Sequence, residues 1–157
     1  MPDPSALGAD RAVLGIASSG EPIVAFPEFP GGAALPKLVV RQRTGQGNWL
    51  QLGTPLNVNA AASVDNLSVA VSGEQISVAW RESVGEVDPS RSLFVKRWNP
   101  ATQTWVLLGG TLSTDRDLRV SALALFPDGG PLVAFSQGTD NFVDANLRVK
   151  ALGVAKP

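Results

Sequence analysis

The side chains of this sequence that could perform acid–base chemistry are carboxylates. The 157 residues include no histidine, cysteine or tyrosine, so the most common general base, the thiol nucleophile and the phenolic acid are all missing. Two carboxylates can hydrolyse a glycoside, and Glu28 and Glu82 are a candidate pair. They occupy equivalent positions in two copies of a repeat, and the matching bases on the adjacent strand are Arg41 and Lys96. We therefore expect cross-strand ion pairs here in preference to an active site.

No metal, cofactor or disulfide is predicted. Asp115 and Asp117 flank a basic residue, and Asp140 and Asp144 lie in a second polar segment. Neither group has the alternating oxygen ligands and central glycine of a calcium loop. The absence of cysteine excludes disulfides and thiolate metal sites.

Ligand recognition is predicted for aromatic and arginine residues that differ between the copies. Trp98 has no aromatic counterpart, because Arg43 and Leu152 occupy its place elsewhere. Together with Arg97 it could stack on a sugar or a peptide, and packing within an outer strand is the equal alternative. The other candidate ligand-binding residues are Arg81, Phe29 and Phe142.

These residues are positioned by a threefold repeat with a period of 54–56 residues. Each copy has apolar residues followed by alanine and an aromatic residue, at 22–26, 75–80 and 131–135. An apolar run and a glycine-containing turn precede each segment, which predicts a β-hairpin. A third apolar run follows, and two copies have a fourth, at 49–53 and 105–109. Because such short runs cannot form amphipathic helices, we predict an all-β fold of three four-stranded antiparallel meanders, the last incomplete.

Four-stranded units that repeat at this period are typical of β-propeller blades. A β-sandwich is the alternative, although sandwiches rarely show self-similarity at a fixed period. We therefore predict one propeller-like domain over residues 1–157, with repeats at about 11–56, 66–112 and 120–157. The segments that join second to third strands, 29–36, 83–92 and 137–146, vary in sequence and should emerge on one face, where binding normally resides.

The copies resemble the propeller-type repeats of bacterial extracellular and surface proteins. The middle copy carries Val-Ala-Trp, Leu-x-Val-Lys-Arg-Trp and Trp-x-x-Leu-Gly at 78–80, 93–98 and 105–109. The third copy departs from the pattern, with Gln137 in place of glutamate. The resemblance implies a scaffold and no particular activity. It also suggests an extracellular or cell-surface origin, although residues 1–4 do not begin a signal peptide.

Three blades are too few for a closed ring, since propellers have about four to eight. We expect two chains to form a six-bladed homodimer, and the alternative is a structural fragment of a longer propeller. The predicted function is a non-catalytic, lectin-like module that binds carbohydrate or protein. A carboxylate-based glycoside hydrolase is a further alternative, but the expectation is that the chain is not an enzyme.

Composition limits the partners. With 44% apolar and 17% charged residues, the chain should fold around a core. A net charge of −1 without a basic cluster argues against nucleic acid and anionic membranes as partners. No apolar run approaches the roughly 18 residues of a membrane span.

Overall fold

Three antiparallel sheets make up the fold in the computed structural model, which describes residues 11–29, 31, 35–85, 90–114, 118–138 and 146–153. Eleven strands and no helix lie within these ranges. The prediction of an all-β fold of repeated antiparallel meanders is therefore confirmed. None of the described residues forms a helix of the length and apolarity needed to cross a membrane.

The first sheet is a four-stranded meander in the order β1-β2-β3-β4. Its strands are β1 (Val13–Ile16), β2 (Pro22–Glu28), β3 (Lys37–Arg43) and β4 (Trp49–Gln51). Gly20 and Gly47, with φ of 83° and 82°, form the tight turns from β1 to β2 and from β3 to β4. Glycine adopts this backbone conformation without the steric cost of a Cβ, so the turns follow from the sequence.

The second sheet repeats this topology in the order β5-β6-β7-β8. Its strands are β5 (Ser63–Ser72), β6 (Gln75–Val84), β7 (Ser90–Asn99) and β8 (Thr104–Leu107). A bulge between Asp65 and Ser68 interrupts the pairing of β5 with β6, and Asn66 there has a φ of 50°. Asparagine tolerates this left-handed conformation better than most residues.

The third sheet has three strands within the described residues, in the order β11-β10-β9. They are β9 (Arg119–Leu125), β10 (Pro131–Gln137) and β11 (Asn146–Ala151). The fourth, outer strand that the first two sheets have is not found among the described residues of the third copy. All six residues of β11 are exposed.

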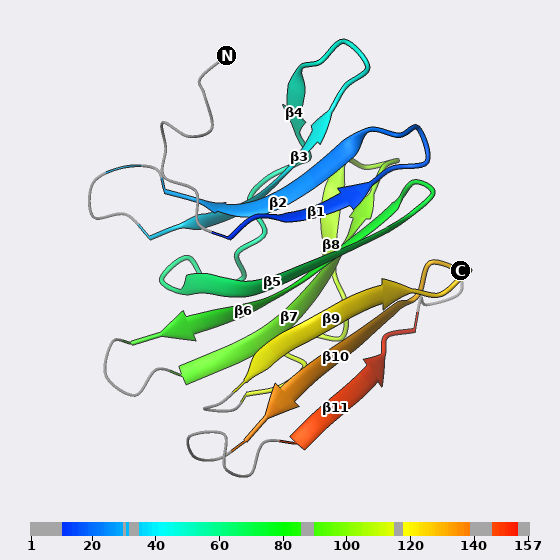
Figure 1. The fold of residues 1–157 in the computed structure, drawn as a ribbon. Coiled ribbons are helices and arrows are strands. Elements are labelled where there is room, and N and C mark those ends of the chain that lie inside the picture. Colours follow the sequence, from blue (N-terminus) through cyan, green and yellow to red (C-terminus); the bar gives the residue numbers. More distant parts are fainter. Residues whose placement is uncertain are drawn as a thin grey trace.

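The sheets stack face to face, with β1, β5 and β9 side by side in Figure 1. Because successive strand residues point to opposite faces, each sheet can bury side chains on two sides. A first apolar core lies between the first and second sheets and includes Ile23, Ala25, Leu38, Val40, Val78, Trp80 and Trp98. A second core lies between the second and third sheets and includes Ala79, Leu93, Val95, Leu118, Val133 and Phe135. The second sheet is therefore covered on both faces.

Candidate functional site

Glu82 is a buried structural carboxylate, with 2% of the residue exposed. Its oxygens accept hydrogen bonds from the backbone N–H groups of Val58, at 2.6 Å, and Asn59, at 2.9 Å. A third hydrogen bond comes from the indole Nε1 of Trp80, at 3.0 Å. The predicted ion pair with Lys96 is wrong, because these three donors occupy the carboxylate and Lys96 Nζ donates instead to the Leu56 carbonyl oxygen, at 2.8 Å.

Glu28 has a different partner from its counterpart Glu82. It forms the predicted ion pair with Arg41, with 2.5 Å between Oε1 and Nη2. The Arg41 guanidinium also lies 5.3 Å from the centre of the Phe26 ring. Both carboxylates of the candidate catalytic pair thus have structural partners, and their different surroundings do not form one site.

The predicted ligand-binding residues lie apart. Trp98 is 8% exposed and packs in the core between the first and second sheets, whereas Arg97 alternates to the other face of β7. Arg81 is paired with Asp65 and donates from Nη1 to the Leu118 carbonyl oxygen, at 2.7 Å, which ties it to the third sheet. Phe29 follows β2 and is 38% exposed. Phe142 lies outside the described residues, as do Asp115, Asp117, Asp140 and Asp144.

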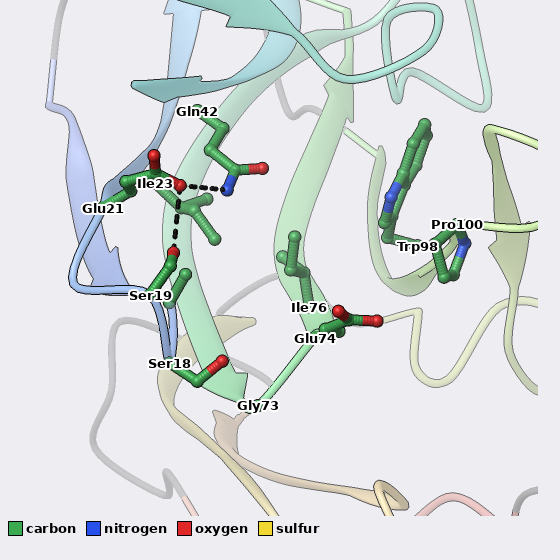
Figure 2. A pocket seen from close by; sticks show the side chains of 11 residues that line it. Ser18, Ser19, Glu21, Ile23, Gln42, Gly73, Glu74, Ile76, Trp98 and Pro100 are labelled. Carbon is green, nitrogen blue, oxygen red and sulfur yellow. Dashed lines mark hydrogen bonds between the residues drawn. The ribbon is translucent and has the colours of Figure 1, made fainter. Parts of the chain in front are cut away.

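A pocket of about 380 Å³ opens between the first and second sheets, and we call it the inter-sheet pocket. Its lining residues include Ser18, Ser19, Glu21, Gln42, Glu74, Ile76, Trp98 and Pro100. In Figure 2, Glu21 and Gln42 lie on one side, Trp98 and Pro100 lie on the other, and Glu74 lies between them. The pocket therefore brings two carboxylates from different sheets to the same space as an indole ring.

The turns between strands position these two carboxylates. Glu21 ends the β1–β2 turn and Glu74 lies in the β5–β6 turn, each directly after a glycine with positive φ. Ser19 Oγ donates to Glu21 Oε2 at 2.9 Å, and Gln42 Nε2 donates to the same oxygen at 3.4 Å. These donors orient the Glu21 carboxylate.

Neither glutamate is among the site residues predicted from the sequence. An acidic residue in a hairpin turn is ordinarily only solvated, so neither one is conspicuous in isolation. The signal that could have identified them is the Gly-Glu dipeptide that recurs in the first hairpin turn of two copies. Trp98, by contrast, was predicted and does line the inter-sheet pocket.

A smaller cavity of about 190 Å³ lies near the opposite end of β5, beside Arg11 and Asp65. The Asp65 carboxylate there is ion-paired with Arg81, whose Nε donates to Oδ1 at 2.7 Å. Because this pairing already engages the Asp65 carboxylate, the inter-sheet pocket, which two glutamates line, is the better candidate for acid–base chemistry. Among the described residues, no three His, Cys, Asp or Glu side chains gather in a way that could hold a metal ion.

Lys96 gives a prediction for the pH dependence of stability. Burial lowers the pKa of Lys96 from 10.5, and the negative charge of Glu82 opposes this effect. Below 10.5 the unfolded chain therefore binds more protons than the folded chain, so stability should rise as the pH increases toward 10.5. The gain in stability from deprotonation of Lys96 is complete above pH 10.5, and it is lost as the pH falls through the lowered pKa of Lys96.

Lys96→Met should flatten this rise in urea unfolding measured from about pH 8 to about pH 11. Lys150→Met is the matched control, because Lys150 occupies the equivalent position on the exposed strand β11. Equal pH slopes for wild type and Lys96→Met would contradict the prediction.

No family model and no curated protein matches the sequence. Solved structures do share the fold. An endo-arabinase from Bacteroides thetaiotaomicron matches with a TM-score of 0.57 at 12% identity, over 96% of this chain and 58% of that chain. A glycosyl hydrolase from Bacteroides ovatus matches with a TM-score of 0.51 at 10% identity, over 90% of this chain and 46% of that chain.

The sialidase of Trypanosoma rangeli, in complex with the inhibitor DANA, matches with a TM-score of 0.50 at 10% identity. The match covers 94% of this chain and 32% of that chain. This chain thus spans less than two thirds of the length of each of these proteins. At such identities the likeness shows the fold alone, and that fold is consistent with the propeller-like folds of glycosidases.

These matches correct the functional prediction. The prediction of a non-catalytic, lectin-like module that is not an enzyme is contradicted, because the endo-arabinase, the glycosyl hydrolase and the sialidase named above, which share the fold, are hydrolases. The interpretation of the repeat as a scaffold without chemistry rests on its recurring carboxylates, Glu28 and Glu82, for which the sequence predicts cross-strand ion pairs. That interpretation overlooked the carboxylates in the turns.

Proposed function

We propose that this chain is a glycoside hydrolase, or the part of one that forms the inter-sheet pocket. The observation that carries the proposal is the presence of two carboxylates, Glu21 and Glu74, in one pocket with the Trp98 ring. Glycoside hydrolysis needs two carboxyl groups on either side of the scissile bond, and aromatic rings pack against the apolar faces of sugars. The fold shared with an endo-arabinase and a sialidase supports the same reaction class.

Each glutamate has a distinct role in this proposal. Glu21, which accepts hydrogen bonds from Ser19 and Gln42, is the carboxylate that attacks the anomeric carbon or activates a water molecule. Glu74, which lines the same pocket from the β5–β6 turn, is the carboxyl group that transfers a proton to the leaving oxygen as the glycosidic bond breaks. Trp98 and Pro100 lie on the opposite side of the pocket and would contact the sugar.

We also propose that the three sheets are half of a six-bladed propeller. The support is the outward faces of the first and third sheets, which no described residue covers and where Ile16 is 55% exposed and Leu147 is 68% exposed. Exposed apolar faces of this kind are usually interfaces.

The function can be tested by hydrolysis of arabinan, sialosides and aryl glycosides with the purified chain. Glu21→Gln and Glu74→Gln should each lower the rate by at least about 100-fold, because each removes one of the two groups that the reaction needs. The double variant should be no slower than the worse single variant, since the two residues act as a unit.

Glu28→Gln is the matched control, because it changes a glutamate that lies outside the pocket and should leave the rate unchanged. Wild-type protein that hydrolyses none of these substrates would overturn the proposal. So would glutamine variants that are folded and as fast as wild type.

A further inference from the structure

Two apolar positions of the third sheet are exposed although the same positions are fully buried in the other sheets. Leu147 is 68% exposed and Val149 is 61% exposed, both on β11. The residues at the equivalent positions of the first and second sheets are each 0% exposed: Leu38, Val40, Leu93 and Val95. In those sheets the following sheet covers the positions, and no described residue does so for the third sheet.

The first sheet has the complementary exposed face. Leu14 is 62% exposed and Ile16 is 55% exposed, both on the inner strand β1. Their equivalents in the second sheet, Val69 and Val71, pack against the core that the first and second sheets share. The third sheet therefore exposes the face that the following sheet covers in the other two copies. The first sheet exposes the face that, in the second sheet, packs against the preceding sheet.

The contact between β1 and β5 shows how two inner strands fit together. A Cβ built on Gly15 would lie 3.4 Å from the Cβ and 2.5 Å from the Cγ2 of Val71, and 3.7 Å from a methyl carbon of Val69. The next inter-sheet contact has Ala70 at the position of Gly15, so alanine is accepted there. Ala124 is the equivalent residue in the third sheet, and it is exposed.

We propose that the exposed face of the third sheet binds the first sheet of a second copy of this chain. In this arrangement Ala124 of one copy lies between Leu14 and Ile16 of the other, as Gly15 lies between Val69 and Val71. A second, symmetry-related contact joins the first sheet of the one copy to the third sheet of the other, and the two contacts together close a two-fold ring of six sheets. The inference rests on the six-bladed ring proposed above and extends it by naming the partner and the contact.

A second copy suits these faces better than an unrelated protein. Each face repeats the residue positions of an inter-sheet interface that the chain already forms, so the new contact continues an existing one. A net charge of −1 per chain causes little repulsion between copies.

Light scattering after size-exclusion chromatography tests the assembly. Wild-type protein should have about twice the chain mass of 16.4 kDa. Val149→Asp should have the mass of one chain, because a carboxylate would be buried without a partner at the interface. Val106→Asp is the matched control. Val106 is exposed on the outer strand of the second sheet, and both faces of that sheet are already covered within the chain. The Val106→Asp protein should therefore keep the mass of two chains.

Engineered cysteines test the contact itself, because the chain has none of its own. Ile16→Cys combined with Ala124→Cys should form disulfides between copies under mild oxidation. The reference pair, Gly15→Cys with Val71→Cys, should form a disulfide within one chain. Its two Cβ atoms would lie 3.4 Å apart, close to the Cβ–Cβ distance of about 3.5–4.5 Å in disulfides. Within the chain Ile16 and Ala124 lie on β1 and β9, and β5 runs between these strands (Figure 1).

A wild-type mass of one chain would overturn the proposal and would favour a further blade of the same polypeptide as the occupant. Disulfides that form only within the chain, or a doubled mass in folded Val149→Asp, would overturn it as well. Neither measurement depends on hydrolytic activity, so failure of this proposal is distinguishable from failure of the proposed reaction.

Discussion

Replacing Glu82 by alanine is expected to lower the free energy of unfolding by about 3–5 kcal/mol. The change leaves three hydrogen-bond donors without their acceptor. The indole of Trp80 is the costliest of them, because that residue is 0% exposed and water cannot replace the carboxylate. The amide donors of Val58 and Asn59 belong to exposed linker residues and regain part of their hydrogen bonding from water. The linker between the first two sheets also loses its attachment to β6.

Glu28→Ala is the control for this experiment, because Glu28 occupies the same position in the first sheet. Its side chain is 20% exposed and makes an ion pair with Arg41, so its loss should cost about 1 kcal/mol or less. Urea unfolding followed by tryptophan fluorescence measures both changes. Similar losses for the two variants would mean that the linker hydrogen bonds contribute little.

The loss in the free energy of unfolding for Glu82→Gln should lie between the losses for Glu82→Ala and Glu28→Ala. Gln137 occupies the equivalent position in the third sheet, where its Oε1 accepts a hydrogen bond from Ser113 Oγ at 3.2 Å. An amide oxygen can therefore bind a linker at this position, but with less charge than a carboxylate.

The strands and their order could be predicted from the sequence because their determinants are local. Apolar runs of alternating burial and glycine turns such as Gly20 specify each hairpin within a few residues. Recurrence of the same pattern three times then indicated three similar sheets.

Contacts between sheets were harder to predict, and Glu82 shows why. The alignment correctly made it equivalent to Glu28, and the ion pair of Glu28 with Arg41 was correct. Two of the three hydrogen-bond partners of Glu82 lie 23 and 24 residues earlier in the chain, in a linker whose path depends on how the sheets pack. An alignment of the repeats shows which positions are equivalent, but it does not show the path of the linker.

The candidate site was missed for the same reason. Glu21 and Glu74 belong to different hairpins, and only the stacking of the first sheet on the second brings both turns to the inter-sheet pocket. The sequence predicted each turn but not which turns meet. Arg81 was selected for its chemistry, and the structure uses that chemistry to connect the second sheet with the third.

Replacing Trp98 by alanine is the second change with a large expected effect, a loss of about 3–5 kcal/mol in the free energy of unfolding. The Trp98 ring centre lies 5.3 Å from that of Trp105, within the core between the first and second sheets. Gly53, with a φ of 64°, leaves room for the ring, because a Cβ there would lie 2.9 Å from Trp98 Cζ3. Alanine at position 98 would leave this space empty and widen the inter-sheet pocket.

Arg97→Ala is the matched control, because Arg97 is the neighbouring residue on the opposite face of β7 and its loss should change stability by about 0.5 kcal/mol or less. Trp98→Phe should lose less than Trp98→Ala, since a phenyl ring refills part of the space and keeps contact with Trp105. Urea unfolding measures all three variants. A Trp98→Ala protein as stable as Arg97→Ala would show that the ring contributes little to the core, which would leave sugar binding in the pocket as its main role.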